Sequence, residues 1–482
     1  MYFYSIVKEN KSYIYLGFAL QFIQKYMSNK IYYSLILLLL YGLSSSAQTK
    51  KWTLEECVNY ALQNNISIKQ TELDIKTAAI DKRGAIGNFL PSLNGNASHS
   101  WNIGLNQDIT TGLLQNQTTQ FTSAGANVGI DIYKGLQNQN TLRRANLSIV
   151  ASKYQLVKMQ EDIALNVANA FLQVLFNKEN LKVQEVQMSI NEKQLIRTQE
   201  LVNAGTIPKG DLLDVKATLA SDNQKVITAE NSLLISKLSL AQLLQLDDFQ
   251  DFDVVDDTEA KDENNILLQT PIAIYDKAKE ERTELKIAQT NLEIAEKNVA
   301  IAKGGFQPTL QGFYNFSTRI SYADIALRDN SGNVIGTQAP PPFFSQFGDN
   351  KGQSFGVQLS IPVFNGFAAR NNVERSQVNL EKSKIAVEQQ DLDLQRNVYT
   401  AFTDAKGALN AHESAIVALE SRQEAYNYAK EKFDVGLMNS FDLNQSQTLL
   451  SNAQSDVLRT KYDYIFKIKI LEFYFGIPII KN

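Results

Sequence analysis

The chain of 482 residues has a single cysteine, Cys57, and only two histidines, His99 and His412. One cysteine cannot form an intramolecular disulfide, so stability must come from packing or from association of subunits. No Cys/His set has the spacing of metal ligands, and no Ser-His-Asp or Cys-His pairing points to nucleophilic catalysis. The sequence therefore predicts neither a cofactor nor an enzyme.

The chain also has no excess of positive charge. The chain has 47 basic and 51 acidic side chains, a net charge of −4. Without residues 1–47, which hold four lysines and one glutamate, 43 basic and 50 acidic groups remain, a net charge of −7. No basic surface for nucleic acid is expected from this balance.

The only strongly apolar run, residues 31–43, is shorter than the roughly 20 residues that a membrane-spanning helix needs. It follows a short basic region, Met27–Lys30, and precedes Ser45-Ser46-Ala47, which resembles a small-residue cleavage site. We predict that residues 1–47 are a signal peptide, with residues 1–26 an extension ahead of a true start at Met27. The rival interpretation is a longer anchor that also uses residues 13–22, but glutamine and lysine residues interrupt it.

The chain repeats itself. In the first half, a segment of alternating apolar and polar residues ends at Gly135, and a helical pattern follows it to Gly205. In the second half, the same two patterns end at Gly366 and Gly436. The two glycines of each half are 70 residues apart. Residues 166–171 match 397–402 at the same offset of 231, whereas 89–93 match 306–310 at an offset of 217. The 14 extra residues of the second half must therefore lie in one loop between 310 and 366. A repeat of this size defines the architectural unit, and we assign residues 48–270 and 271–482 to the two repeats.

Four segments alternate between apolar and polar residues over the length of a tilted membrane strand. The polar faces carry mostly Asn, Gln, Ser and Gly, as expected of a wet lumen, although a soluble β-sandwich would show the same alternation. Small barrels have about eight strands, so four strands in a membrane imply that several chains share one barrel. The apolar faces, on which His99 is the one misfit, are Leu93, Gly95, Ala97, Trp101 and Ile103; Ala124, Ala126, Val128, Ile130 and Ile132; Leu310, Gly312, Tyr314 and Phe316; and Phe355, Val357, Leu359, Ile361 and Val363.

Proline is absent from residues 137–203 and 367–434, and glycine nearly so. Both stretches are rich in Ala, Leu, Glu, Gln and Lys and predict helices of roughly 100 Å, whose apolar residues, Phe171 and Phe402 among them, pack against neighbouring helices. Further helices are predicted at 211–246, 441–475, 54–86 and 274–303, and an acidic, solvated linker at 247–265.

An ordered set of motifs runs along the chain: residues 52–56 (WTLEE), the entry 89–93 (FLPSL) into the first strand, and the turns at 204–206 (AGT) and 435–437 (VGL). In this set the chain resembles the TolC-like outer-membrane efflux family, over nearly all of its mature length. The resemblance implies an α+β membrane protein: a trimeric outer-membrane β-barrel with four strands per chain, continued by a long periplasmic α-helical barrel.

The resemblance also implies a function. The trimer would be the passive exit duct of a tripartite efflux or type I secretion system, served by a periplasmic adaptor protein and an inner-membrane pump. The alternative is a structural or surface-attachment trimer without transport. Adaptors dock at the helix-turn-helix tips of such proteins, which fall on 204–207 and 435–438 and include Ala204, Gly205, Thr206, Val435, Gly436 and Leu437.

In the family, acidic residues beyond the second turn line the closed periplasmic entrance. The matching positions are Asp442 and Gln445, so one carboxylate ring is expected instead of two. Phe433 stands where the best-known member has a tyrosine of the closing network, and Met438 where it has an arginine. The groups of that latch are therefore missing, and Lys209 is a candidate substitute cation.

Asp211 and Asp214 occupy the corresponding place in the first half. They either line the entrance or serve the start of a helix, and we favour an N-cap for Asp211 because acidic caps are common there. For the helix that carries Asp442, Ser440 is available as the cap. Trp101 and Tyr133, near strand ends, fit either an interfacial aromatic belt or ordinary packing.

The cleavage site yields a first prediction. Mass spectrometry of the mature protein should find Gln48, or its cyclised form, at the N-terminus, because signal peptidase cuts after small residues such as Ala47. A mature protein that begins at Met1 or retains residues 31–43 would contradict both the signal peptide and the exported topology.

Overall fold

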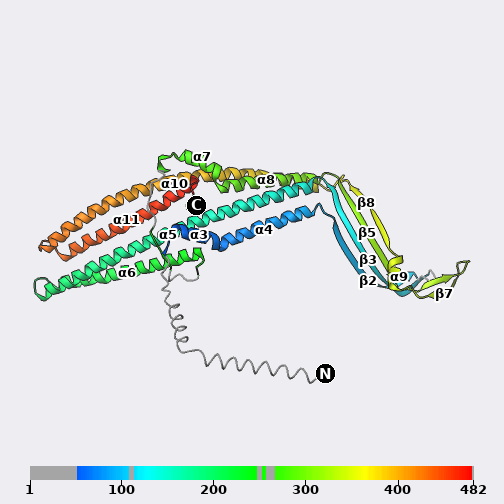
Figure 1. Cartoon of the computed structure of the whole chain (residues 1–482), viewed down its shortest axis with the longest axis horizontal. Coiled ribbons are helices and arrows are strands. Elements are labelled where there is room, and N and C mark those ends of the chain that lie inside the picture. The colour runs from blue at the N-terminus through cyan, green and yellow to red at the C-terminus, as the bar shows by residue number, and fades with distance from the viewer. Residues whose placement is uncertain (1–50, 108–112, 247–251, 257–265, 480–482) are drawn as a thin grey trace, which may run out of the picture. The chain divides into compact units, whose positions relative to one another are not determined.

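A computed structural model describes residues 51–107, 113–246, 252–256 and 266–479 (Figure 1). The predicted signal peptide, the cleavage site and most of the acidic linker lie outside these residues. The chain divides into two compact units. The described residues of the smaller unit are 51–52 and 252–253; they comprise β1 (Lys51–Trp52) and the first residue of β4 (Asp253–Val254), and the rings of Trp52 and Phe252 lie 5.9 Å apart. All further elements belong to the larger unit.

Four long strands form one antiparallel sheet in the order β2-β3-β5-β8. They are β2 (Ser92–Gln107), β3 (Leu114–Lys134), β5 (Thr309–Ser321) and β8 (Gly352–Ser360). Each contains most of a predicted strand, but the fourth prediction is wrong at its end. Ile361 and Val363 follow β8 instead of belonging to it, because Pro362 between them has no N–H for the ladder.

The register of the sheet keeps the two chemical faces apart across both repeats. Phe313 is an aromatic exception on the polar face, and its ring lies against Gly356, where a Cβ atom would come within 3.1 Å of it. Phe313 lies in the row Ser92, Gly129, Phe313 and Gly356, and the next two rows follow the predicted alternation. The apolar row is Leu93, Val128, Tyr314 and Phe355, and the neighbouring polar row is Asn94, Asn127, Asn315 and Ser354.

The two predicted rods are present as α5 (Gln137–Asn203) and α10 (Ala368–Asp434), each of 67 residues. Each is followed by a return helix, α6 (Lys209–Leu244) or α11 (Ser440–Tyr474). The residue before each rod, Leu136 or Phe367, has a positive φ at the same place in the repeat. The sharp passage from strand to rod is therefore duplicated too.

The segments 54–86 and 274–303 were each predicted to form a single helix. This prediction is wrong, because each segment contains two helices. The first consists of α3 (Leu54–Asn64) and α4 (Ile66–Gly87), and the second of α7 (Pro271–Glu281) and α8 (Thr283–Gly304). A single extended residue breaks each pair, Asn65 with ψ 132° and Arg282 with ψ 128°. The Asn65 side chain accepts a hydrogen bond from the Ser67 N–H at 2.9 Å and donates to the Leu243 carbonyl at 3.0 Å, so tertiary contacts outweigh helix propensity here.

The helices lie in one layer and keep the order of the strands. Beside the sheet the neighbours run α4-α5-α8-α10, and farther along they run α6-α5-α11-α10 (Figure 1). Phe171 is fully buried. Phe402 packs against a hydrophobic cluster around Ile274, Val398 and Leu471. The predicted core role of both phenylalanines is therefore confirmed. The 3-10 turn η1 (Ile266–Leu268) leads into the second repeat at this cluster.

The extra residues of the second half lie where the offsets require, in the connection between β5 and β8. This connection spans 322–351, where the first half has only 108–113. It contains the hairpin β6 (Ile325–Arg328) and β7 (Val334–Gln338), followed by the short helix α9 (Phe343–Asp349).

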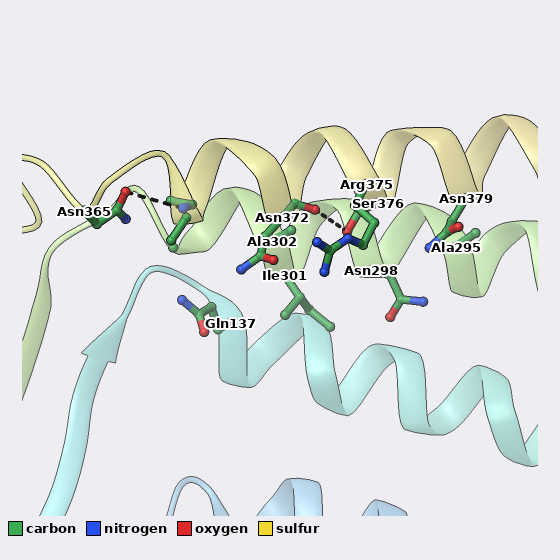
Figure 2. A pocket seen from close by; sticks show the side chains of 13 residues that line it. Gln137, Ala295, Asn298, Ile301, Ala302, Asn365, Asn372, Arg375, Ser376 and Asn379 are labelled. Carbon is green, nitrogen blue, oxygen red and sulfur yellow. Dashed lines mark hydrogen bonds between the residues drawn. The ribbon is translucent and has the colours of Figure 1, made fainter.

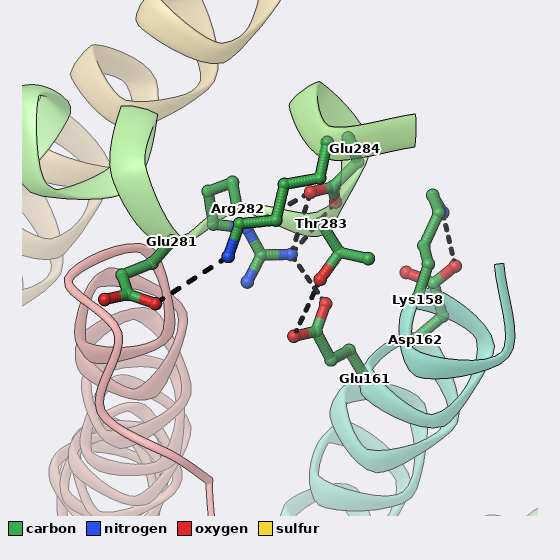
Figure 3. A network of polar contacts seen from close by, with 8 residues as sticks. Lys158, Glu161, Asp162, Glu281, Arg282, Thr283 and Glu284 are labelled. Carbon is green, nitrogen blue, oxygen red and sulfur yellow. Dashed lines mark hydrogen bonds and ion pairs between the residues drawn. The ribbon is translucent and has the colours of Figure 1, made fainter. Parts of the chain in front are cut away.

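Arg282, the break residue of the second half, joins three helices through a buried guanidinium group (Figure 3). Its side chain is only 4% exposed, and Nη2 lies 3.0 Å from carboxylate oxygens of both Glu161 on α5 and Glu284 on α8. The guanidinium carbon lies 3.8 Å from the ring centre of Phe473 on α11. Burial raises the pKa of Glu161, and the positive charge of Arg282 opposes that rise.

This network predicts a large effect of Arg282→Ala. The change leaves two partly buried carboxylates without their cation and should reduce the free energy of unfolding by about 3 to 5 kcal/mol, measured by denaturant titration in detergent. The loss should shrink as the pH falls from 7 to 5, because without the opposing charge of Arg282 burial raises the pKa of Glu161 further, so the folded variant takes up this proton before the unmodified protein does.

The matched control is Arg396→Ala. Arg396 makes a 3.0 Å ion pair with Asp393, but its side chain is 69% exposed, so its removal should cost under about 1 kcal/mol. Equal effects of the two substitutions would show that the Arg282 network does not hold the break in place.

Candidate functional site

Two helical hairpins end in matching turns far from the sheet (Figure 1). In the first turn the Gly205 N–H donates to the Val202 carbonyl and the Thr206 N–H donates to the Leu201 carbonyl, both at 3.0 Å. In the second, Gly436 donates to Phe433 at 3.0 Å and Leu437 donates to Lys432 at 2.8 Å. Both glycines are left-handed, with φ of 74° and 79°, which closes the same type of helix C-cap.

The residues predicted at the tips are exposed in both hairpins. Ala204, Gly205 and Thr206 carry little apolar surface. In the second turn Val435 is 71% and Leu437 79% exposed. The two tips therefore have the same backbone conformation but different side chains at the surface, and the second tip presents the larger apolar area.

The predicted N-cap role of Asp211 is wrong. Helix α6 begins after Pro208, which has extended backbone and makes no side-chain cap, so Asp211 is the third helical residue. The predicted cap Ser440 is wrong as well, because Asn439 accepts a hydrogen bond from the Asp442 N–H at 2.9 Å. The turn residues fix where these helices start, and propensity alone placed the start too late.

Asp211 and Asp442 are thus equivalent first-turn acids, each the third residue of a return helix. Both carboxylates gain from the positive end of the helix dipole. Asp442 is exposed and Asp211 half-buried, while Asp214 and Gln445 are exposed one turn later. Within a single chain these residues stay on separate hairpins.

A contact between the two hairpins was not foreseen from the sequence. Arg197 on α5 places Nη1 2.6 Å from Oδ1 of Asp434 at the end of α10, and its guanidinium carbon lies 5.8 Å from the ring centre of Phe433. Both charged side chains are 40 to 49% exposed, so the pair stabilises the fold by at most about 1 kcal/mol. In the single chain Arg197 is the cation beside Phe433, a position for which Lys209 was only a candidate. Met438 is half-buried in the same turn.

A polar hollow of about 560 Å³ lies where α5 and α10 start, beside the end of α8 (Figure 2). Arg144 donates a 3.2 Å hydrogen bond to Asn298 of its lining. Arg375 is the one charged side chain among the lining residues, so this wall can hydrogen-bond water or polar solutes without strong selection by charge. The lining amides are Gln137, Asn298, Asn365, Asn372 and Asn379.

Across the described residues, no group of three or more His, Cys, Asp or Glu side chains is placed to hold a metal ion. The two histidines lie on different elements, His99 on β2 beside Thr122 and His412 on α10 beside Thr460. Of the helices that the structure describes, none has the length and apolar character of a membrane span.

Comparison with known proteins agrees with this geometry. The family model described as "Outer membrane efflux protein" matches residues 57–245 and 274–469. The outer membrane protein TolC of Vibrio cholerae is 24% identical over 437 residues, which cover 86% of this chain and 88% of that protein. The cation efflux system protein CusC of Escherichia coli O157:H7 is 24% identical over 377 residues, covering 76% of this chain and 72% of CusC.

Solved structures show the same fold. A crystal structure of CusC has a TM-score of 0.72 at 16% identity and covers 88% of this chain and 91% of that one. The outer membrane protein VceC of Vibrio cholerae has a TM-score of 0.69 at 15% identity, covering 88% and 96%. The predicted α+β fold is thereby confirmed, and so are the outer-membrane location and the non-enzymatic, efflux-channel character. Because the family model covers both halves of the chain, the protein belongs to the outer membrane efflux protein family.

Proposed function

We propose that three copies of the chain form the passive exit duct of a tripartite efflux or type I secretion system. The observation that carries this proposal is the open sheet. Among the described residues, β2 and β8 each pair with one neighbour, so both edges expose unpaired backbone groups. In lipid, each unpaired group costs several kcal/mol, and a closed barrel removes that cost. Three sheets of four strands supply the twelve strands of such a barrel.

The two faces of the sheet support the same arrangement. Phe355 and Val357 on the apolar face are 83% and 67% exposed, an area that lipid would cover. The opposite face carries the row of asparagines and would line the lumen. A structural or attachment trimer, the alternative function, has no use for a wet inner face.

The helical layer has open edges as well. Along much of α10, the last helix of the layer, side chains are exposed, and α4 and α6 lie at the opposite edge. Copies related by a three-fold axis would join these edges and continue the barrel as a helical tunnel. In this proposal the two repeats, residues 48–270 and 271–482, contribute equivalent walls.

The hairpin tips are the proposed docking sites for a periplasmic adaptor protein. Exposed Val435, Leu437 and Phe441, the last 65% exposed, form the larger apolar area, and such patches are typical of protein contacts. The first tip, Ala204 to Thr206, offers a smaller surface of the same backbone shape. Each copy would therefore present two different docking sites.

At the closed entrance three copies of Asp442 would form one carboxylate ring, with Gln445 one turn away. The contacts of Arg197 with Phe433 and Asp434 would hold the two hairpins of each copy together. In this proposal Asp211 and Asp214, at the equivalent positions of the first hairpin, serve the start of α6 and are not part of the ring.

The barrel predicts unequal tolerance on the two faces of β8. Phe355→Arg, in a row near the middle of the sheet, should cost about 2 to 4 kcal/mol and impair trimer assembly, with a somewhat smaller cost for Val357→Arg and Leu359→Arg. Gln358→Arg faces the lumen and should be tolerated. Trimer yield after membrane extraction measures the effect, and equal tolerance on both faces would mean that the strands are not in lipid.

Copurification separates a duct from an attachment trimer. The intact protein, cross-linked in cells, should bring down a periplasmic adaptor and an inner-membrane pump, and Leu437→Asp should weaken that capture without loss of trimer. A trimer that never captures either partner would support the attachment function instead.

The entrance generates a further prediction. Asp442→Asn should reduce cation selectivity and block by multivalent cations in planar-bilayer recordings, because a ring of carboxylates in a narrow passage concentrates cations. The effect of the ring should weaken as salt rises, since the Debye length is about 10 Å at 0.1 M.

Asp211→Asn is the matched control. It removes a carboxylate from the same position of the other return helix and therefore loses a similar contribution of about 0.3 to 1 kcal/mol from the helix dipole. Selectivity should change little in this variant. Identical recordings for Asp442→Asn and the unmodified protein would contradict the proposal that Asp442 forms a ring at the entrance.

A further inference from the structure

The helix α9 in the β5–β8 connection lies on the apolar face of the sheet. Phe316, Thr318 and Ile320 alternate in phase with Tyr314 on that face. The Thr318 hydroxyl donates to the Phe347 carbonyl of α9 at 3.1 Å, and the ring centres of Phe316 and Phe347 are 6.1 Å apart. Beneath this contact Thr318 is 4% and Ile320 0% exposed, so α9 covers the outer end of β5.

The side of α9 that meets the sheet is fixed by polar contacts. Gln346 is buried; its Oε1 accepts from the Ser321 N–H at 2.9 Å, and its Nε2 donates to the Ser321 carbonyl at 2.9 Å and the Pro341 carbonyl at 2.8 Å. After the helix, Asn350 donates to the Arg319 carbonyl at 2.7 Å. These bonds hold α9 in one orientation.

The start of α9 is aromatic and exposed. Phe344 is 85% and Phe343 41% exposed, and their ring centres lie 5.3 Å apart in a T-shaped arrangement. Phe343 also stacks with Phe347 at 6.5 Å, so it lies at the edge of the side that meets the sheet. A helix that is held to the sheet by Gln346 and Phe347 and exposes two phenylalanines at its start needs an apolar partner.

At the same level the apolar face of the sheet becomes amphipathic. His99, the misfit of the sequence pattern, lies 2.8 Å from the Thr122 hydroxyl, which lies 2.9 Å from the Tyr322 hydroxyl. Trp101 contacts His99 with ring centres 4.2 Å apart, and Thr122 pairs with Ile320. Side chains with an apolar body and a polar tip collect at the boundary between lipid tails and headgroups.

The spacing of the two ends of the sheet fits a membrane. Tyr133, whose hydroxyl bonds Gln307, marks the end near the helices, and Thr122 lies eleven residues away along β3. At about 3.4 Å per residue and a tilt of about 40°, this separation is roughly 28 Å, close to the apolar band of about 25 Å on outer-membrane barrels. Because α9 is at the end of β5 remote from α8, it lies on the outer side.

We propose that α9 is an interfacial helix that inserts Phe343 and Phe344 into the outer leaflet of the outer membrane, between the headgroups and the first segment of the lipid tails. The hydrogen-bonded group of His99, Thr122 and Tyr322 marks the same boundary on the sheet. This inference rests on the proposed barrel, because it requires the apolar face to meet lipid.

Tryptophan fluorescence in phosphatidylcholine and phosphatidylglycerol vesicles tests this position. The starting variant is Trp52→Phe with Trp101→Phe, which removes both tryptophans of the chain. Phe344→Trp in this background should be quenched at least two-fold more strongly by lipids with a nitroxide at tail carbon 5 than at carbon 12. Phe355→Trp, in the central apolar row, should show the reverse order, and its neighbour Ser354→Trp on the polar face should escape both labels.

The outcomes separate this inference from the barrel. If Phe344→Trp escapes both labels while Phe355→Trp is quenched, α9 faces water or a neighbouring copy, and the inference fails although the barrel stands. If Phe355→Trp escapes as well, the proposed barrel fails. Trp52→Phe alone provides a second measurement without a change in α9: its Trp101 should be quenched most by the shallow label, and stronger quenching at carbon 12 would place the boundary elsewhere and overturn the inference.

Discussion

The structure depends on a single-layer arrangement of its sheet and its long helices. An ordinary domain buries the apolar face of a sheet against a second layer. Here, apart from α9 at one end of β5, neighbouring elements of the sheet and the long helices meet at their flanks, so Leu93 remains 71% and Val357 67% exposed. In the proposed trimer, lipid, lumen water and further copies of the chain would cover these faces and the two open edges of the sheet.

Duplication provides the layer with two equivalent walls and then allows each to differ. The hairpin turns keep the same hydrogen bonds around Gly205 and Gly436, because a left-handed C-cap tolerates little change. Their side chains are free to diverge, and Val435 and Leu437 have no apolar counterparts at Ala204 and Thr206. The insertion with α9 lies at the opposite end of the second repeat, where a loop between strands can lengthen without disturbing the ladder.

Sequence periodicity predicted the large elements because each rests on a long, regular signal. Alternation located all four strands, and the absence of proline located both 67-residue rods. Sequence periodicity did not predict features that depend on single residues. Nothing in the local pattern shows that Asn65 and Arg282 are extended, since their conformations depend on contacts with distant helices. The contact of Arg197 with Asp434 was missed for the same reason, because it joins positions 237 residues apart. His99 could be recognised as a misfit, but only the register with Thr122 gives it partners.

The two breaks at Asn65 and Arg282 occupy matching places but differ in chemistry. At the first break, the neutral side-chain amide of Asn65 forms hydrogen bonds with its neighbours. At the second, the buried guanidinium group of Arg282 contacts three helices. Glu161 belongs to α5 of the first hairpin and Phe473 to α11 of the second, so the Arg282 contact couples the two hairpins of one copy. In the proposed ring of three copies, the six hairpins would then move as three pairs, each pair tilting as one unit.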